Sequence, residues 1–278
     1  MIFENHPISG EIYLLGYGIS LALSLILTLI LVKAISKENW LTHLLNKLSV
    51  SSSKVVSPFG GIPVVLSFFI VLWFFYIIGW IHQENLRLLQ VITLGVGLMT
   101  ILGIYDDAHN CSPKTKLFFQ ISIATILYFA GFQIERIGNI IELGPLSILL
   151  TIFWIVGITN SINLIDGVDG LASGLIFLSC MTLTLGYLER DITEAAFLAV
   201  ILSGSVLGFF VFNFPPAKII LGDTGSLPLG LLISLITLLP LNQLFSDEIY
   251  YLIPIITLLI PILDTIFAFY RRFLKGVS

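Results

Sequence analysis

Charged residues are scarce in this chain. Only 11% of its 278 residues are Asp, Glu, Lys or Arg, and the mean hydropathy is +1.03. Soluble domains carry about 25% charged residues. The composition therefore excludes an ordinary soluble protein, and we expect no nucleic-acid partner. The formal net charge of -4 is uninformative until the charges are sorted by membrane side.

Cysteine and histidine are also rare. Cys111 and Cys180 stand in different segments without the spacing of a metal site or a disulfide framework. Of the four histidines, only His109 lies near the clustered acids Asp106 and Asp107. The first 11 residues contain no Lys or Arg, so the first apolar stretch lacks the basic leader of a cleavable signal peptide. We expect a retained helix there.

Long apolar stretches fill the rest of the chain. Many of them are close to the length of about 20 residues that a helix needs to cross a bilayer. They predict one all-α membrane domain over residues 1–278, a polytopic bundle of about nine transmembrane helices. The predicted spans are 12–33, 62–81, 87–105, 115–132, 146–162, 171–188, 195–212, 225–240 and 249–270.

The basic residues orient these spans. With the N-terminus outside and the C-terminus in the cytoplasm, every Lys and Arg except Arg87, Arg136 and Arg190 falls in a cytoplasmic connection, as the positive-inside rule favours. We expect the protein in the cytoplasmic (inner) membrane. Apolar residues recur at helical spacing over 40–48, which predicts a short interfacial helix.

Five acids gather on the predicted cytoplasmic face, from three loops far apart in sequence. Acids at a membrane edge are functional candidates, because a charge near hydrocarbon needs a partner, a metal or water. In GIYDDAHNCSPKTKLFFQ, Asp106 and Asp107 lie about 100° apart on a helix, which suggests different tasks. Lys114 and Lys116 begin the next span. A solvated helix end is the alternative interpretation.

The second motif, NSINLIDGVDG, spans 160–170. As one helix, it would place Asn163, Asp166 and Asp169 along one polar edge, because residues three apart are neighbours. Gly167 and Gly170 make a helix end passing into a turn an equal alternative. An amide and two acids suit Mg²⁺, which prefers oxygen ligands, or a nucleotide.

The third motif, FNFPPAKIILGDTGS, contains Asn213 at a span end and Asp223 ahead of an apolar run. Asp-Thr-Gly-Ser is typical of a helix start, where free amides favour an anion or a metal-bound phosphate. Simple helix capping is the alternative. Asp264, inside the last span, is either a buried structural residue or part of the site.

Clustered acids and lysines at a membrane face suit phosphate transfer on a lipid, with a metal and lysines neutralising phosphate charge. A transporter is disfavoured, since its charged residues usually lie near the membrane midplane.

The motifs LGIYDD with PKTKLFFQ, NLIDGVDGLASG and FNFPPAKIILGDTGSLPLG occur here in this order. Together they resemble the polyprenyl-phosphate N-acetylhexosamine-1-phosphate transferases, glycosyltransferase family 4, over about residues 53–274. The resemblance implies transfer of an N-acetylaminosugar-1-phosphate from a UDP-sugar to undecaprenyl phosphate at the cytoplasmic membrane face. UMP is released, and the product starts cell-envelope polysaccharide synthesis of the O-antigen kind.

The resemblance also implies roles for individual residues. Mg²⁺ is the expected cofactor, with Mn²⁺ as a substitute, and Asp223 is the expected metal ligand. The catalytic candidates are Asp106, Asp107 and Asp166, with Asp106 as base toward the lipid phosphate; direct attack and an aspartyl intermediate are both compatible. The expected substrate-binding residues are Lys114, Lys116, Asn163, Asp169, Asn213 and Lys54. A homodimer is compatible with such a bundle.

Two departures from the family pattern stand out. Phe59 occupies the place of a family arginine, and the sequence has no histidine after His109, whereas similar proteins carry a C-terminal His-x-His-His loop and a further helix. The alternative expectation is therefore an inactive, shortened homologue that retains nucleotide or lipid binding.

Overall fold

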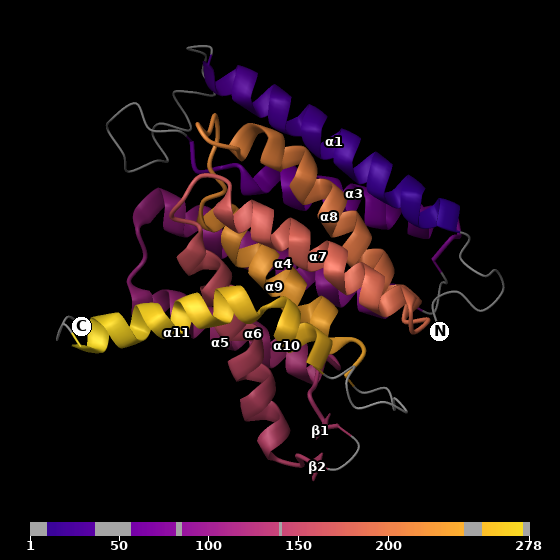
Figure 1. Ribbon diagram of the computed structural model, residues 1–278, viewed down its shortest axis with the longest axis vertical. Coiled ribbons are helices and arrows are strands. Elements are labelled where there is room, and N and C mark those ends of the chain that lie inside the picture. Colours follow the sequence, from indigo (N-terminus) through magenta and orange to yellow (C-terminus); the bar gives the residue numbers. More distant parts are fainter. Residues whose placement is uncertain (1–9, 37–56, 82–84, 139–140, 242–251, 275–278) are drawn as a thin grey trace.

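In the computed structural model, residues 10–36, 57–81, 85–138, 141–241 and 252–274 are described. Most of them are helical, and the few strand residues form one short hairpin, which confirms the all-α prediction. The helices are α1 (Gly10–Ser36), α3 (Gly61–Ile77), α4 (Leu86–His109), α5 (Pro113–Phe129), α6 (Leu146–Ile165), α7 (Leu171–Leu188), α8 (Thr193–Asn213), α9 (Asp223–Leu238), α10 (Ile253–Thr257) and α11 (Leu259–Leu274). Strands β1 (Arg136–Ile137) and β2 (Ile141–Glu142) form a small antiparallel hairpin at the lower edge of Figure 1.

Five helices are long and apolar enough to cross a membrane, namely α1, α4, α6, α7 and α8. Shorter apolar helices cover Gly61–Ile77, Asp223–Leu238 and Leu259–Ala268. These lengths and compositions support a membrane protein, while the count of nine spans stays a prediction. The interfacial helix predicted over 40–48 and the side chain of Lys54 lie outside the described residues.

The last predicted span, 249–270, is wrong as a single helix. The chain forms α10 and α11 with a break at Leu258. Pro261 explains the break, because its ring would clash with the carbonyl four residues earlier and it has no N–H to donate. That carbonyl belongs to Thr257, and it instead accepts a hydrogen bond from the Ser179 hydroxyl of α7 at 3.3 Å.

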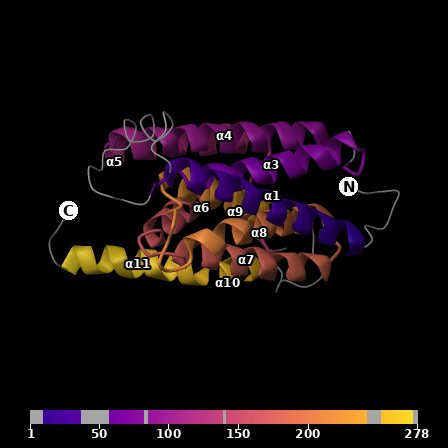
Figure 2. The ribbon, with the colours of Figure 1, turned by 90° about the horizontal axis from the view of Figure 1, so that it is seen from above.

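Helix α9 is the centre of the bundle. It packs against α3, α4, α6, α7 and α8, and Figure 2 shows it between α3 and α4 on one side and α7 on the other. Every residue of α9 after Asp223 is buried. A helix that is apolar on all sides belongs in such a central position.

Short connections join α4 to α5, α6 to α7 and α8 to α9, and each turns the chain back at the same end of the bundle. The C-terminal ends of α4, α6 and α8 therefore meet the N-terminal ends of α5, α7 and α9. These six ends carry the three sequence motifs. The fold thus brings the motifs to one end of the bundle.

Candidate active site

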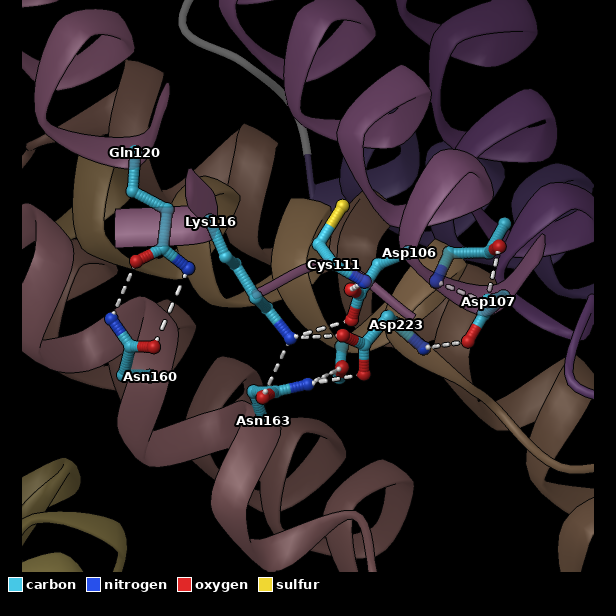
Figure 3. A network of polar contacts seen from close by, with 10 residues as sticks. Asp106, Asp107, Cys111, Lys116, Gln120, Asn160, Asn163 and Asp223 are labelled. Atoms are coloured by element: carbon cyan, nitrogen blue, oxygen red, sulfur yellow. Dashed lines mark hydrogen bonds and ion pairs between the residues drawn. The ribbon is translucent and has the colours of Figure 1, made fainter. Parts of the chain in front are cut away.

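Lys116 is the centre of a polar cluster at this end of the bundle. It lies in the first turn of α5, and its ammonium group donates to Asp106 Oδ2 at 3.1 Å and to Asn163 Oδ1 at 3.3 Å, and it forms an ion pair with Asp223. Figure 3 shows the side chain reaching from α5 to groups of three other helices. The lysine side chain is only 15% exposed. One cation thus neutralises two largely shielded carboxylates.

Asn163 connects this cation to the start of α9. It lies in the last turn of α6, and its amide donates to Asp223 Oδ1 at 2.7 Å and to Ser226 Oγ at 2.8 Å. Its oxygen accepts from Lys116. Both ends of the amide are therefore used, which fixes the orientation of the Asp223 carboxylate.

Asp106 and Asp107 have different partners, as their angular separation on α4 predicts. Asp106 accepts from the Cys111 backbone N–H at 2.7 Å and faces Lys116. Asp107 accepts from the backbone N–H groups of Asp223 and Thr224, at 3.1 and 2.8 Å, and from the Thr224 hydroxyl at 2.6 Å. Asp107 therefore caps the N-terminus of α9 from a neighbouring helix.

The close approach of α4 to α9 makes this cap possible. A Cβ atom at Gly103 would clash with the backbone of Asp223, so a larger residue there would push the helices apart. Gly222, just before α9, has a φ of +68°, a value that glycine adopts without strain. The Gly-Asp-Thr-Gly-Ser motif does begin a helix, as predicted. The side chain that caps this helix belongs to Asp107 of α4.

Asp166 lies beside this cluster, directly after the last residue of α6. Burial and the negative charge of Asp223 raise the pKa of Asp166 to about 8, against the opposing effect of a hydrogen bond from the Gly222 backbone. The helix ends before Asp166 and a turn follows, so the helix-to-turn alternative for this motif is confirmed. At neutral pH the group is largely protonated in the ligand-free protein.

Asn213 and Asp169 form a second, separate group. The buried amide oxygen of Asn213 accepts from the Gly170 N–H at 3.1 Å and the Ser173 hydroxyl at 2.6 Å, and its nitrogen donates to the Ile219 carbonyl at 3.0 Å. Asp169 is exposed and accepts from the Ala217 N–H at 3.0 Å. These contacts connect the α6–α7 turn to the α8–α9 loop. The structure therefore does not place Asp169 on one polar edge with Asp166.

Two other predicted residues lie apart from the cluster. Lys114 is exposed at the start of α5, and Asp264 is exposed on α11, so Asp264 is not the buried structural residue considered from the sequence. Four residues at the site were not predicted: Thr224, Ser226, Gln120 and Asn160. The serine and threonine stand inside the third motif, and the two amides lie one turn from Lys116 and Asn163, which is the signal that was available.

The donor set fits a divalent cation that a substrate also binds. Asp106, Asp223 and Asn163 converge with oxygen atoms on one position, where Lys116 now supplies the positive charge. Among the described residues, no group of three or more His, Cys, Asp or Glu side chains is arranged as metal ligands. Mg²⁺ commonly binds through one or two carboxylates and completes its shell with water and phosphate. Two carboxylates here satisfy that requirement.

An apolar cavity of about 620 Å³ adjoins the cluster. It lies between α5, α6 and α11, and its lining includes Leu117, Phe153, Asn160, Ile262 and Ile266. Asn160 is one helical turn from Asn163. Leu117, Phe153 and Ile266 are exposed, so the cavity approaches the polar cluster from the outer, apolar surface of the bundle.

A comparison with known proteins decides the family. The model of glycosyl transferase family 4 matches residues 89–240, more than half of the chain, and this range contains the whole polar cluster. The chain belongs to glycosyl transferase family 4. The resemblance seen in the sequence motifs is thereby confirmed.

Several curated relatives are similar to this family 4 chain. The probable undecaprenyl-phosphate N-acetylglucosaminyl 1-phosphate transferase of Bacillus subtilis is 42% identical over 195 residues, 67% of this chain and 53% of the relative. The phospho-N-acetylmuramoyl-pentapeptide-transferase of Streptococcus uberis is 33% identical over 193 residues, 64% of this chain and 58% of the relative. The chain spans about half the length of the curated relatives it matches.

Proposed function

We propose that this chain transfers an N-acetylaminosugar-1-phosphate from a UDP-sugar to undecaprenyl phosphate at the cytoplasmic membrane face, releasing UMP. The reaction would start synthesis of a cell-envelope polysaccharide of the O-antigen kind. The observation that carries the proposal is the position of the Lys116, Asp106, Asp223 and Asn163 cluster beside an apolar cavity. The names of the relatives support the same reaction class.

The cluster suits the charges of this reaction. An oxygen of the lipid phosphate attacks the phosphorus attached to the sugar, a new diphosphate bond forms, and the bond to UMP breaks. Negative charge is spread over phosphate oxygens throughout, so positioning and charge stabilisation supply most of the catalysis. Lys116 would hold the diphosphate, and Asp106 would accept a proton from the lipid phosphate.

Asp223, with Asp106 beside it, would hold Mg²⁺ or Mn²⁺ together with the diphosphate of the substrate. The bound metal would neutralise phosphate charge and favour departure of UMP. Asn163 fixes the Asp223 carboxylate for this task. Asp107 would act indirectly. Its oxygens accept hydrogen bonds from the first N–H groups of α9, the helix that begins with Asp223.

The apolar cavity supports the choice of a lipid acceptor. A polyprenyl chain is a long hydrocarbon, and a cavity of about 620 Å³ lined by aliphatic and aromatic side chains is suited to part of it. Its phosphate would then lie near Lys116. GlcNAc-1-phosphate is the first sugar phosphate to test, because the Bacillus subtilis relative bears that name.

The test is UMP release by purified protein supplied with undecaprenyl phosphate, UDP-GlcNAc and Mg²⁺. Asp223→Asn should reduce the rate about 100-fold or more, the usual effect of removing a group that stabilises transition-state charge. Asp191→Asn is the matched control, since it makes the same change at the opposite end of the bundle, between α7 and α8. Folded protein that releases no UMP from UDP-GlcNAc or from other UDP-aminosugars would contradict the proposal.

A further inference from the structure

Helix α5 carries the central lysine but lies at the edge of the bundle. Its principal neighbours among the described elements are α4 and α6. Phe118, Phe119 and Phe129 on its other side are exposed. The position of Lys116 therefore depends on how α5 is held against these two helices.

A pair of amides connects α5 to α6 directly beside Lys116. The Asn160 amide donates to Gln120 Oε1 at 2.7 Å, and the Gln120 amide donates back to Asn160 Oδ1 at 3.4 Å. Gln120 is fully buried, and Asn160 also donates to the Val156 carbonyl at 2.8 Å. These bonds run in both directions, so they fix the rotation of both side chains.

The pair repeats, one helical turn away, the contact made at the site. Lys116 and Gln120 are four residues apart on α5, and Asn163 and Asn160 are three residues apart on α6, so each pair shares a helix face. Figure 3 shows the contact of Gln120 with Asn160 alongside that of Lys116 with Asn163. A shift of α5 along or around α6 would break both contacts together.

The surroundings of the pair strengthen this constraint. Asn160 lines the apolar cavity, whose lining offers few polar groups, and an unpaired amide there would be unfavourable. Polar side chains hold helices together in membranes for the same reason. The amides already satisfy each other, so they are poorly placed to bind a substrate directly.

We propose that Gln120 and Asn160 are positioning residues, which set the register of α5 against α6 and thereby hold Lys116 beside Asp223 and Asn163. The link to catalysis rests on the transferase function proposed above. The structural part of the proposal, the placement of Lys116, does not depend on that function and has its own readout.

The first readout is acetylation of lysines by acetic anhydride, measured by mass spectrometry on purified protein without substrates. Lys116 is shielded and paired, whereas Lys114 two residues away is exposed and serves as the internal reference. Gln120→Leu should raise acetylation of Lys116 relative to Lys114 roughly three- to fifteen-fold, the range expected for loss of an interhelical hydrogen bond in a membrane protein. Gln120→Asn, a milder change, should raise it less.

Two further variants distinguish a specific effect on the position of Lys116 from a general loosening of the helix bundle. The exchange Gln120→Asn with Asn160→Gln keeps the combined side-chain length and should return the ratio toward that of the original protein. Ser24→Ala removes a hydrogen bond of 2.5 Å between α1 and α8, away from α5, and should leave the ratio unchanged. An unchanged ratio in folded Gln120→Leu and Gln120→Asn, or an equal rise in Ser24→Ala, would overturn the proposal.

The catalytic part is tested by transferase kinetics of the same variants. The proposal predicts a fall in kcat with a smaller change in KM for undecaprenyl phosphate, and recovery of kcat in the exchanged pair. A rise in that KM alone would assign Asn160 to lipid binding and overturn the positioning role. If the original protein shows no transferase activity, the proposed function fails, while the acetylation ratios still decide whether the pair places Lys116.

Discussion

Lys116 neutralises two carboxylates that would otherwise repel each other. Asp106 and Asp223 approach each other from different helices, and two shielded carboxylates with no cation between them would be unfavourable. The lysine supplies that cation in the ligand-free protein. In the proposed reaction, a metal bound by the carboxylates would leave the charge of Lys116 available for the diphosphate.

Replacing Lys116 tests this role. Lys116→Met should lower UMP release about 100-fold or more, since it removes positive charge from the reacting phosphates. Lys114→Met should have a smaller effect, because the Lys114 side chain is exposed at the edge of the cluster. Steady-state rates of both variants check the prediction, and equal losses would contradict the central position of Lys116.

Asp166 gives a prediction about pH. Because burial and Asp223 raise its pKa to about 8, the folded protein binds this proton more tightly than the unfolded chain, whose aspartates titrate near 4. The stability linked to this proton is complete below about pH 4 and is lost as the pH rises through 8. Asp166→Asn should therefore raise the thermal unfolding temperature, more at pH 8 than at pH 5.

That measurement needs purified protein without divalent cations, so that no metal competes with the proton. The same variant should lose transferase activity if Asp166 is catalytic. An equal stabilisation at both pH values would show that the carboxyl group is not strongly perturbed.

At the scale of elements, the N-terminus of α9 is capped by a residue of another helix. Asp107 of α4 accepts hydrogen bonds from the first two N–H groups of α9 and from the Thr224 hydroxyl. Anions at this end also interact favourably with the helix dipole. The cap therefore connects helix stability to the position of Asp223.

Loss of this cap should destabilise the protein. Thr224→Val removes the hydroxyl contact, which should lower the free energy of unfolding by about 1 kcal/mol. Asp107→Ala leaves two partly buried N–H groups unpaired and should lower it by about 2 to 4 kcal/mol. Thermal or denaturant unfolding of both variants measures the difference. A loss for Asp107→Ala no larger than that for Thr224→Val would argue against the cap.

Helix positions were largely predictable from the sequence, because apolar runs of membrane length and the Gly-Asp-Thr-Gly-Ser start are local signals. The break at Leu258 was not predicted, because a proline such as Pro261 can either kink a helix or interrupt it. The cap by Asp107 was not predictable. It depends on how closely α4 approaches α9 at Gly103, which is a property of tertiary packing.

At the scale of the whole molecule, the alternation of helix direction gathers three distant motifs at one end. The sequence predicted this convergence from charge and topology, but it did not separate two groups of residues. Lys116, Asn163 and Asp223 form one group, whereas Asn213 and Asp169 connect two loops beside it. Spacing along one helix shows which residues share a face, yet it does not show which face of another helix they meet.

The predicted orientation can be tested with the two native cysteines. Cys111 is partly exposed at the site end, whereas Cys180 is fully buried. A maleimide that cannot cross membranes should therefore label Cys111 in inside-out vesicles and not in intact cells whose outer face is accessible. Labelling from the outer face would reverse the predicted topology.

The central claim, transfer of the sugar together with its phosphate, is tested most directly by following the two phosphates of the donor. UDP-GlcNAc labelled on the phosphate next to the sugar is incubated with the protein, undecaprenyl phosphate and Mg²⁺, and the lipid and water phases are separated. The account predicts that this label enters the lipid phase, while a label on the phosphate next to uridine remains in water as UMP. Label from the sugar-side phosphate that remains in water, as UDP or as unreacted donor, would contradict it.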